Sequence, residues 1–156
     1  MLQQSWGPLA AESALFDFAN TTYYEPQMGG GLKLQLLAFE QPMEPAALVQ
    51  RKLAANELEA LYAASGEFEE QRPLNIDPGY LTLAKFVLAT TKDASHRLYL
   101  GEGIFAEVTL YYAHGKWQAW PWTYPNYREQ RYHEFLSRCR KRLAQLCKED
   151  QQSPER

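Results

Sequence analysis

Residues 74–108 read LNIDPGYLTLAKFVLATTKDASHRLYLGEGIFAEV, and the interpretation of the whole chain depends on this stretch. An apolar run at 81–89 lies between two polar clusters, one in NID and one in TTKDASHR. A segment that only packs does not need so many ionisable and hydroxyl groups at its ends, because such groups are mostly exposed in folded proteins. The stretch therefore predicts a polar site.

The clearest hairpin of the chain lies at the end of this stretch, with strands expected at residues 96–100 and 104–112. The glycine-rich triplet 101–103 supplies its turn. If all three residues form the loop, Arg97 lies opposite Glu107, and both side chains point to the same face. A shift of one residue in the turn would undo this pairing.

The apolar run itself is compatible with a buried strand or with a helix, because almost every position in it is apolar. Its length of about ten residues and its Ala, Leu and Lys content favour a helix. We therefore predict one short buried helix at residues 82–90, with Thr82 as its cap.

Around this centre the sequence predicts an α+β fold, in which a mostly antiparallel sheet packs against two longer helices. The expected strands are 15–19, which pairs with 32–40, then 74–77, which Pro78-Gly79 stops, and 117–120. The longer helices are expected at 46–64, after Pro45, and at 126–148, where Asn126 and Glu129 have the capping-box spacing. Lys52 and Asn56 share one helix face, and a solvated flank is the favoured interpretation of that face.

Length and composition indicate one globular domain at residues 1–150 and a polar tail at 151–156, since the chain has 156 residues, 46% of them hydrophobic. A net charge of −3 argues against a protein that coats nucleic acid. No apolar run reaches the roughly 18 residues of a membrane span, so no membrane partner is expected. Cys139 and Cys147 are too far apart on one helix to form a disulfide, which favours a reducing cytoplasm.

Known catalytic and nucleotide-binding signatures are absent: the chain contains no GxxxxGK[ST], no HExxH and no GxSxG. The three histidines have no ligand spacing, so neither a metal nor a cofactor is expected. Hydroxyl groups and cations together can hold a phosphate or carboxylate through charge-assisted hydrogen bonds. The leading hypothesis is thus a phosphorylated small molecule or a nucleotide, bound by Asn75, Lys85, Thr90, Thr91, Lys92 and Arg97.

Two other functions stay open. A small acid–base enzyme would use Asp77, His96 and Glu107, although a turn cap for Asp77 and a cross-strand ion pair for Glu107 are the favoured interpretations of each carboxylate. An interaction module for RNA or a protein would use the aromatic segment 120–127 and the last helix, with Arg138 and Arg142.

Four segments carry a resemblance: YYEPQMG (23–29), NIDPGYLTLAKFVLATTKD (75–93), SHRLYLGEGIFAEVTL (95–110) and PWTYPNYR (121–128). Together they are similar to the bacterial domain-of-unknown-function family 4416 over nearly the whole chain. The resemblance implies no established activity, and the GTP-binding label of some members has no motif here to support it.

The chain also departs from the pattern of this family. Members usually begin with an additional strand and helix, so one sheet edge is expected to lack a neighbour here or to be covered by a homodimer partner. Thr22 and Asn126 stand where the family pattern has Asp. These two loops are therefore not expected to supply catalytic carboxylates.

Overall fold

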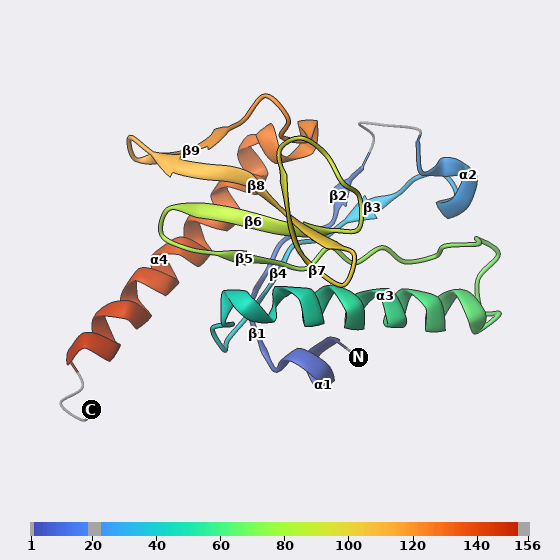
Figure 1. Cartoon of the computed structure of the whole chain (residues 1–156), viewed down its shortest axis with the longest axis horizontal. Helices are drawn as coiled ribbons and strands as arrows, with labels where there is room; N and C mark the ends of the chain where they lie inside the picture. The colour runs from blue at the N-terminus through green and yellow to red at the C-terminus, as the bar shows by residue number, and fades with distance from the viewer. Residues whose placement is uncertain (1, 19–22, 153–156) are drawn as a thin grey trace. The chain divides into compact units, whose positions relative to one another are not determined.

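The computed structural model of the chain describes residues 2–18 and 23–152 (Figure 1). The expectations for Thr22 and for the tail at 153–156 lie outside the described residues, and 151–152 belong to the last helix. Contacts group the chain into two compact units, residues 1–80 with 88–107 and residues 81–87 with 108–156. That the chain forms a single domain stays a prediction.

The first unit begins with short elements that pair in two small antiparallel ladders. One ladder joins β1 (Leu9–Glu12) to β4 (Leu37–Phe39), and the other joins β2 (Phe16–Asp17) to β3 (Lys33–Leu34). The strand expected at 32–40 is therefore divided, and only its first part pairs with the strand expected at 15–19. The helices of this unit are α1 (Leu2–Trp6), α2 (Glu25–Met28) and α3 (Leu48–Ala64), the last preceded by a 3₁₀ turn, η1 (Pro45–Ala47).

Helix α3 confirms the first long helix, but the face that carries Lys52, which was expected to be solvated, is buried. Leu48, Lys52 and Ala55 are its buried residues, at a spacing of four and three. Lys52 is only 4% exposed, so the solvated flank predicted for it is wrong. Helix α1 lies beside α3 (Figure 1), where Arg51 donates to the Ser5 carbonyl at 3.4 Å.

A five-stranded sheet has β5 (Gly79–Leu81), β6 (Lys85–Thr90), β8 (Ile104–Ala113) and β7 (Arg97–Gly101) in that order, and β9 (Lys116–Ala119) also pairs with β8. The short buried helix predicted at 82–90 is therefore wrong, because this segment contains β6. Phe86 and Val87 are both buried although they point to opposite faces of the strand. A strand covered on both faces is apolar throughout, and its pairing overrides the helix propensity of Ala, Leu and Lys.

Thr82 caps a turn instead of a helix. Its hydroxyl accepts hydrogen bonds from the backbone N–H groups of Ala84 and Lys85, both at 3.1 Å. A Thr side chain stabilises a turn in this way. The prediction that Thr82 caps a helix is therefore wrong.

Residues 74–77 form no strand, which corrects another expectation. The N–H of Ile76 donates to Glu59 Oε1 at 2.8 Å, and its carbonyl accepts from Lys52 Nζ at 2.7 Å. Side chains of α3 thus satisfy backbone groups that a neighbouring strand would otherwise pair. Pro78-Gly79 is not a stop either, since Gly79 begins β5.

The hairpin of β7 and β8 confirms the pairing of Arg97 with Glu107. Its turn is shorter than expected, because Gly101 pairs with Ile104 and only two residues form the loop. Glu102 and Gly103 have positive φ of 51° and 74°, as in a type I′ turn. A register shift at Leu100 then restores the predicted pairing further along the strands.

Strand β9, which pairs with β8, confirms the strand expected at 117–120, and α4 (Gln130–Gln152) confirms the last helix. Helix α4 buries Tyr132, Phe135 and Leu136. The predicted capping box at Asn126 is wrong, because that residue lies inside a 3₁₀ turn, η2 (Pro125–Arg128), and is buried. The strands and helices together make this an α+β chain, and none of its described helices has the length and apolar character to cross a membrane.

Candidate functional site

A buried carboxylate organises the polar corner between β6 and β7. Glu107, on β8, is 6% exposed. One of its oxygens, Oε2, accepts a hydrogen bond from Arg97 Nε at 3.0 Å and lies 3.1 Å from His96 Nε2. We name Lys92, His96, Arg97 and Glu107 the Glu107 cluster.

Arg97 is held at a second point in this cluster. Its Nη1 donates to the carbonyl of Lys92 at 2.9 Å, so the guanidinium ties β7 to the turn that follows β6. Thr90 fixes the same turn, because its hydroxyl accepts the Lys92 N–H at 3.2 Å. Within residues 2–18 and 23–152, Nη2 of Arg97 has no hydrogen-bond partner.

The cation of Lys92 lies against an aromatic ring at the surface. Its Nζ is 4.9 Å from the ring centroid of Tyr23 and 3.5 Å from the phenol oxygen. A cation over a tyrosine ring is attracted by about 0.5–1 kcal/mol at an exposed site. The side chains of Thr91 and Lys92 are exposed, so both are accessible from solvent.

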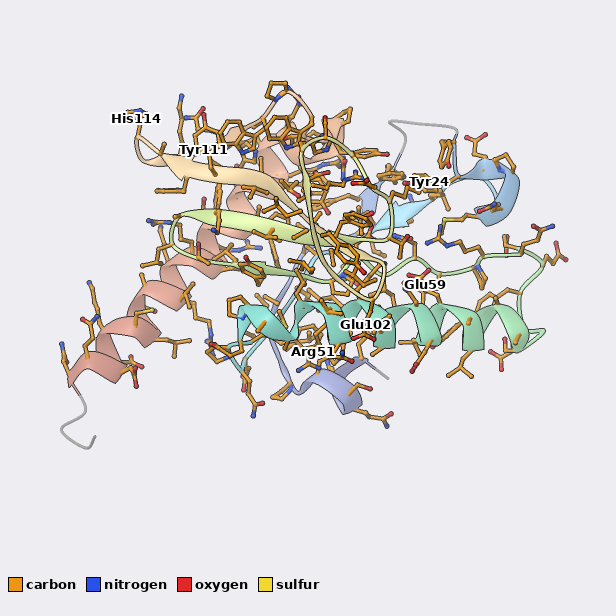
Figure 2. The ribbon with its side chains drawn as sticks, viewed as in Figure 1. Tyr24, Arg51, Glu59, Glu102, Tyr111 and His114 are labelled. Atoms are coloured by element: carbon orange, nitrogen blue, oxygen red, sulfur yellow. The ribbon has the colours of Figure 1, made fainter. Side chains whose placement is uncertain are left out.

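A second polar network joins α3 to residues 72–77. Lys52 Nζ lies 3.3 Å from Asp77 Oδ1 and 3.8 Å from Glu59 Oε1, in addition to its bond to the backbone of this segment. Glu59, labelled on α3 in Figure 2, also pairs with Arg72 at 2.9 Å. Asn75 donates to Asp77 at 2.9 Å and accepts from Arg72. We name Lys52, Glu59, Arg72, Asn75 and Asp77 the Lys52 latch.

The structure thus divides the predicted site residues. It gathers Thr90, Lys92, His96, Arg97 and Glu107 in one corner, with Thr91 beside them, and it places Asn75 and Asp77 in the Lys52 latch. Lys85 begins β6 and Thr90 ends it, which separates them by roughly 17 Å at the rise of a strand. Of the three acid–base candidates, His96 and Glu107 are in contact, while the hydrogen bonds of Asp77 run to Lys52 and Asn75.

Sequence reasoning missed several members of these networks. Lys52 and Glu59 are seven residues apart and share one face of α3, a spacing that the sequence does display. Arg72 and Tyr23 have no such helical spacing, because Glu59 lies 13 residues from Arg72 and Lys92 lies 69 residues from Tyr23. Within the described ranges, no group of three His, Cys, Asp or Glu side chains gathers to hold a metal ion.

In the second unit, Arg128 bonds to three carbonyls of the aromatic segment 120–127. Arg128 donates to the carbonyls of Trp120, Pro121 and Thr123 at 2.8, 2.9 and 3.0 Å. The rings of Trp120 and Trp122 are stacked, with centroids 5.2 Å apart and planes 7° apart. This arrangement leaves Trp122 37% exposed.

Burial also affects two side chains of α4. It raises the pKa of the Cys139 thiol, a shift that the neighbouring Arg138 partly offsets. Burial likewise raises the pKa of Tyr132. Cys139 and Cys147 are both free thiols, and Cys147 is exposed.

Fold and site together define an α+β protein with a carboxylate-centred polar corner. The chain belongs to the family described as Domain of unknown function (DUF4416), whose model matches residues 1–143. The family resemblance seen in the sequence is thus confirmed. No curated protein and no solved structure matches the chain.

Proposed function

We propose that this protein binds a phosphate-bearing small molecule or a nucleotide at the Glu107 cluster. The observation that carries the proposal is the anchoring of Arg97 by Glu107 and by the Lys92 carbonyl. These two bonds use Nε and Nη1, and they leave Nη2 for a ligand. A guanidinium held in place before binding loses less side-chain entropy when it meets a phosphate.

Neighbouring groups add the other donors that a phosphate needs. Lys92 supplies an ammonium group at the same turn, and Thr91 supplies an exposed hydroxyl. Charged and hydroxyl donors around one anion form the shorter and stronger class of hydrogen bonds. His96 shares the Glu107 oxygen with Arg97, so it lies at the edge of the same site.

The test uses Lys92→Ala, because Lys92 is exposed and its removal leaves the buried Arg97–Glu107 pair intact. Binding of inorganic phosphate, AMP, GTP and ribose 5-phosphate is measured by calorimetry on the folded protein. A hydrogen bond to a charged group contributes about 1.5–3 kcal/mol, so Lys92→Ala should weaken binding at least tenfold. Lys116→Ala, another exposed lysine outside the cluster, is the matched control and should bind as the wild type does.

Two results would count against the proposal. One is that none of the four phosphates binds to protein whose circular dichroism spectrum shows it folded. The other is that Lys92→Ala and Lys116→Ala bind equally well. An acid–base role for Asp77, His96 and Glu107 stays a prediction.

A second candidate is an interaction module for RNA, which the aromatic segment favours. Trp122 and Tyr124 are exposed beside the stacked Trp120, and bases can stack on such rings. The run RCRKR at 138–142 of α4 adds four cations in five residues. Affinity for a single-stranded RNA oligomer should fall steeply with salt and again when Arg138 and Arg142 are both replaced by Gln. If that double variant binds RNA as tightly as the wild type, the helix is not the binding surface.

A further inference from the structure

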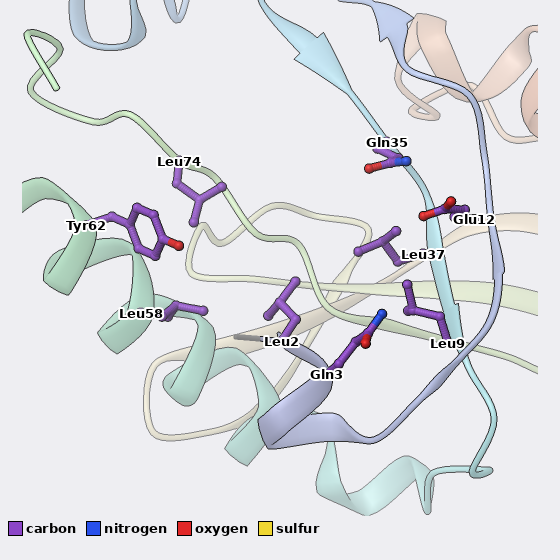
Figure 3. A pocket seen from close by; sticks show the side chains of 9 residues that line it. All are labelled: Leu2, Gln3, Leu9, Glu12, Gln35, Leu37, Leu58, Tyr62 and Leu74. Atoms are coloured by element: carbon purple, nitrogen blue, oxygen red, sulfur yellow. The ribbon is translucent and has the colours of Figure 1, made fainter. Parts of the chain in front are cut away.

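A cavity of about 410 Å³ opens in the first unit, and none of its lining residues belongs to the Glu107 cluster or the Lys52 latch (Figure 3). Its apolar wall consists of five leucines contributed by α1, β1, β4, α3 and the connection after α3: Leu2, Leu9, Leu37, Leu58 and Leu74. Tyr62 of α3 adds an aromatic ring. The volume lies in the range of small-molecule sites, about 300–1,000 Å³.

The cavity is also lined by three polar side chains, Gln3, Glu12 and Gln35, of which only Gln3 lies next to Leu2 and Leu9 in Figure 3. Glu12 ends β1 and Gln35 lies just before β4, the strand that pairs with β1, and the two form one end of the cavity, while Figure 3 shows Tyr62 on the opposite side. Gln35 Nε2 donates to the Ser13 carbonyl at 3.0 Å, so the oxygen of this amide is the atom that remains for a ligand. The carboxylate of Glu12 has no ion pair or hydrogen bond within the described ranges.

Both atoms at this end are hydrogen-bond acceptors, and one of them is charged. A carboxylate accepts only, and the anchored amide of Gln35 presents its carbonyl oxygen. A head group that complements both atoms carries hydrogen-bond donors, and cationic N–H donors would also complement the charge of Glu12. The leucines and the Tyr62 ring suit an apolar body attached to such a head group, because apolar surface buried there leaves water.

We infer that this cavity binds a small amine: an apolar or aromatic body with an ammonium or amidinium head directed at Glu12 and Gln35. The site is separate from the proposed phosphate site, and neither inference depends on the other. An amine and a phosphate have opposite charge, so the two sites would also select different molecules.

The experiment compares three probes of similar size: phenethylammonium, the neutral 2-phenylethanol and the anionic 3-phenylpropionate. Each is titrated into ¹⁵N-labelled protein at one pH and one ionic strength, and amide shifts of Leu9, Leu37 and Leu74 are followed. A fragment of this size binds in about the millimolar range. The ammonium probe should bind most tightly and the carboxylate most weakly, with shifts at the cavity amides.

Glu12→Gln removes the charge and keeps the size of the side chain. This substitution should weaken the binding of phenethylammonium about three- to fivefold, the range that the loss of an exposed ion pair gives, and leave the binding of 2-phenylethanol unchanged. Glu57→Gln is the matched control, because Glu57 is exposed on α3 and does not line the cavity. The inference is overturned if 3-phenylpropionate binds as tightly as the amine, if both variants behave alike, or if no probe shifts the cavity amides at millimolar concentration.

Discussion

Replacing Lys52 by Met tests whether the Lys52 latch holds the first unit together. Methionine keeps most of the aliphatic stem of this buried residue and removes only its charge and its hydrogen bonds. The Ile76 carbonyl then loses its 2.7 Å partner, and the carboxylates of Glu59 and Asp77 lose a shared cation. We expect a clear loss of stability without a change of fold.

The size of that loss follows from what each partner retains. Removing one member of a buried ion pair costs about 3–5 kcal/mol when the other charge is left unpaired. Glu59 is not left unpaired, because Arg72 and the Ile76 N–H still contact it, and the side chain of Asp77 is 49% exposed. The main loss is then the hydrogen bond from the Lys52 ammonium group, which contributes about 1.5–3 kcal/mol. We expect the free energy of unfolding to fall by about 2–3 kcal/mol in total.

Urea unfolding followed by circular dichroism measures this difference in the free energy of unfolding. The slope with urea should stay that of the wild type, since a changed slope would indicate a changed unfolded state or an intermediate. Lys141→Met on the exposed side of α4 is the control and should stay within about 0.5 kcal/mol of the wild type. If Lys52→Met is equally mild, the latch does not stabilise the unit and the reasoning fails.

Two further predictions concern the second unit. Burial raises the pKa of the Cys139 thiol, so a smaller fraction of this thiol is thiolate at pH 8. Iodoacetamide should therefore label the exposed Cys147 faster than Cys139 in the folded protein, and unfolding in urea should abolish the difference. Arg128→Lys removes the guanidinium group that binds three carbonyls of the aromatic segment. The tryptophan emission should then shift to the red, and the free energy of unfolding should fall by about 1.5–3 kcal/mol. An unchanged emission maximum would contradict this prediction.

The β7–β8 hairpin shows how a sequence prediction can be right for an incomplete reason. The pairing of Arg97 with Glu107 was counted from a three-residue loop, whereas the loop has two residues and a bulge at Leu100. The two differences cancel, so the same faces meet. Turn residues indicate that a hairpin exists. A β-bulge, however, depends on the twist of the strands and on the strands beside them, which sequence spacing does not show.

The errors at residues 74–90 have a common physical origin. Local propensity favoured a strand at 74–77 and a helix at 82–90, but tertiary partners decided both segments. Side chains of α3 satisfy the backbone of Ile76, and β6 is buried on both faces, at Phe86 and at Val87. The α3 side chains and β8 are distant in sequence, and the local apolar pattern did not distinguish a strand that follows β5 from a helix.

The predicted site residues fall into two separate groups because, here too, tertiary partners decide where each segment lies. Residues 90–97 are close in sequence and stay together around Glu107, since one hairpin and one turn carry them. Asp77 looked similar in chemistry, yet the segment that carries it is bound to α3 through Lys52. A buried lysine requires carboxylate partners, because its charge is costly to remove from water. Asp77 therefore helps to satisfy a structural charge, while Glu107 positions an arginine whose outer nitrogen is left for a ligand. It is this difference in partners, rather than residue type, that makes the Glu107 cluster the better candidate for binding.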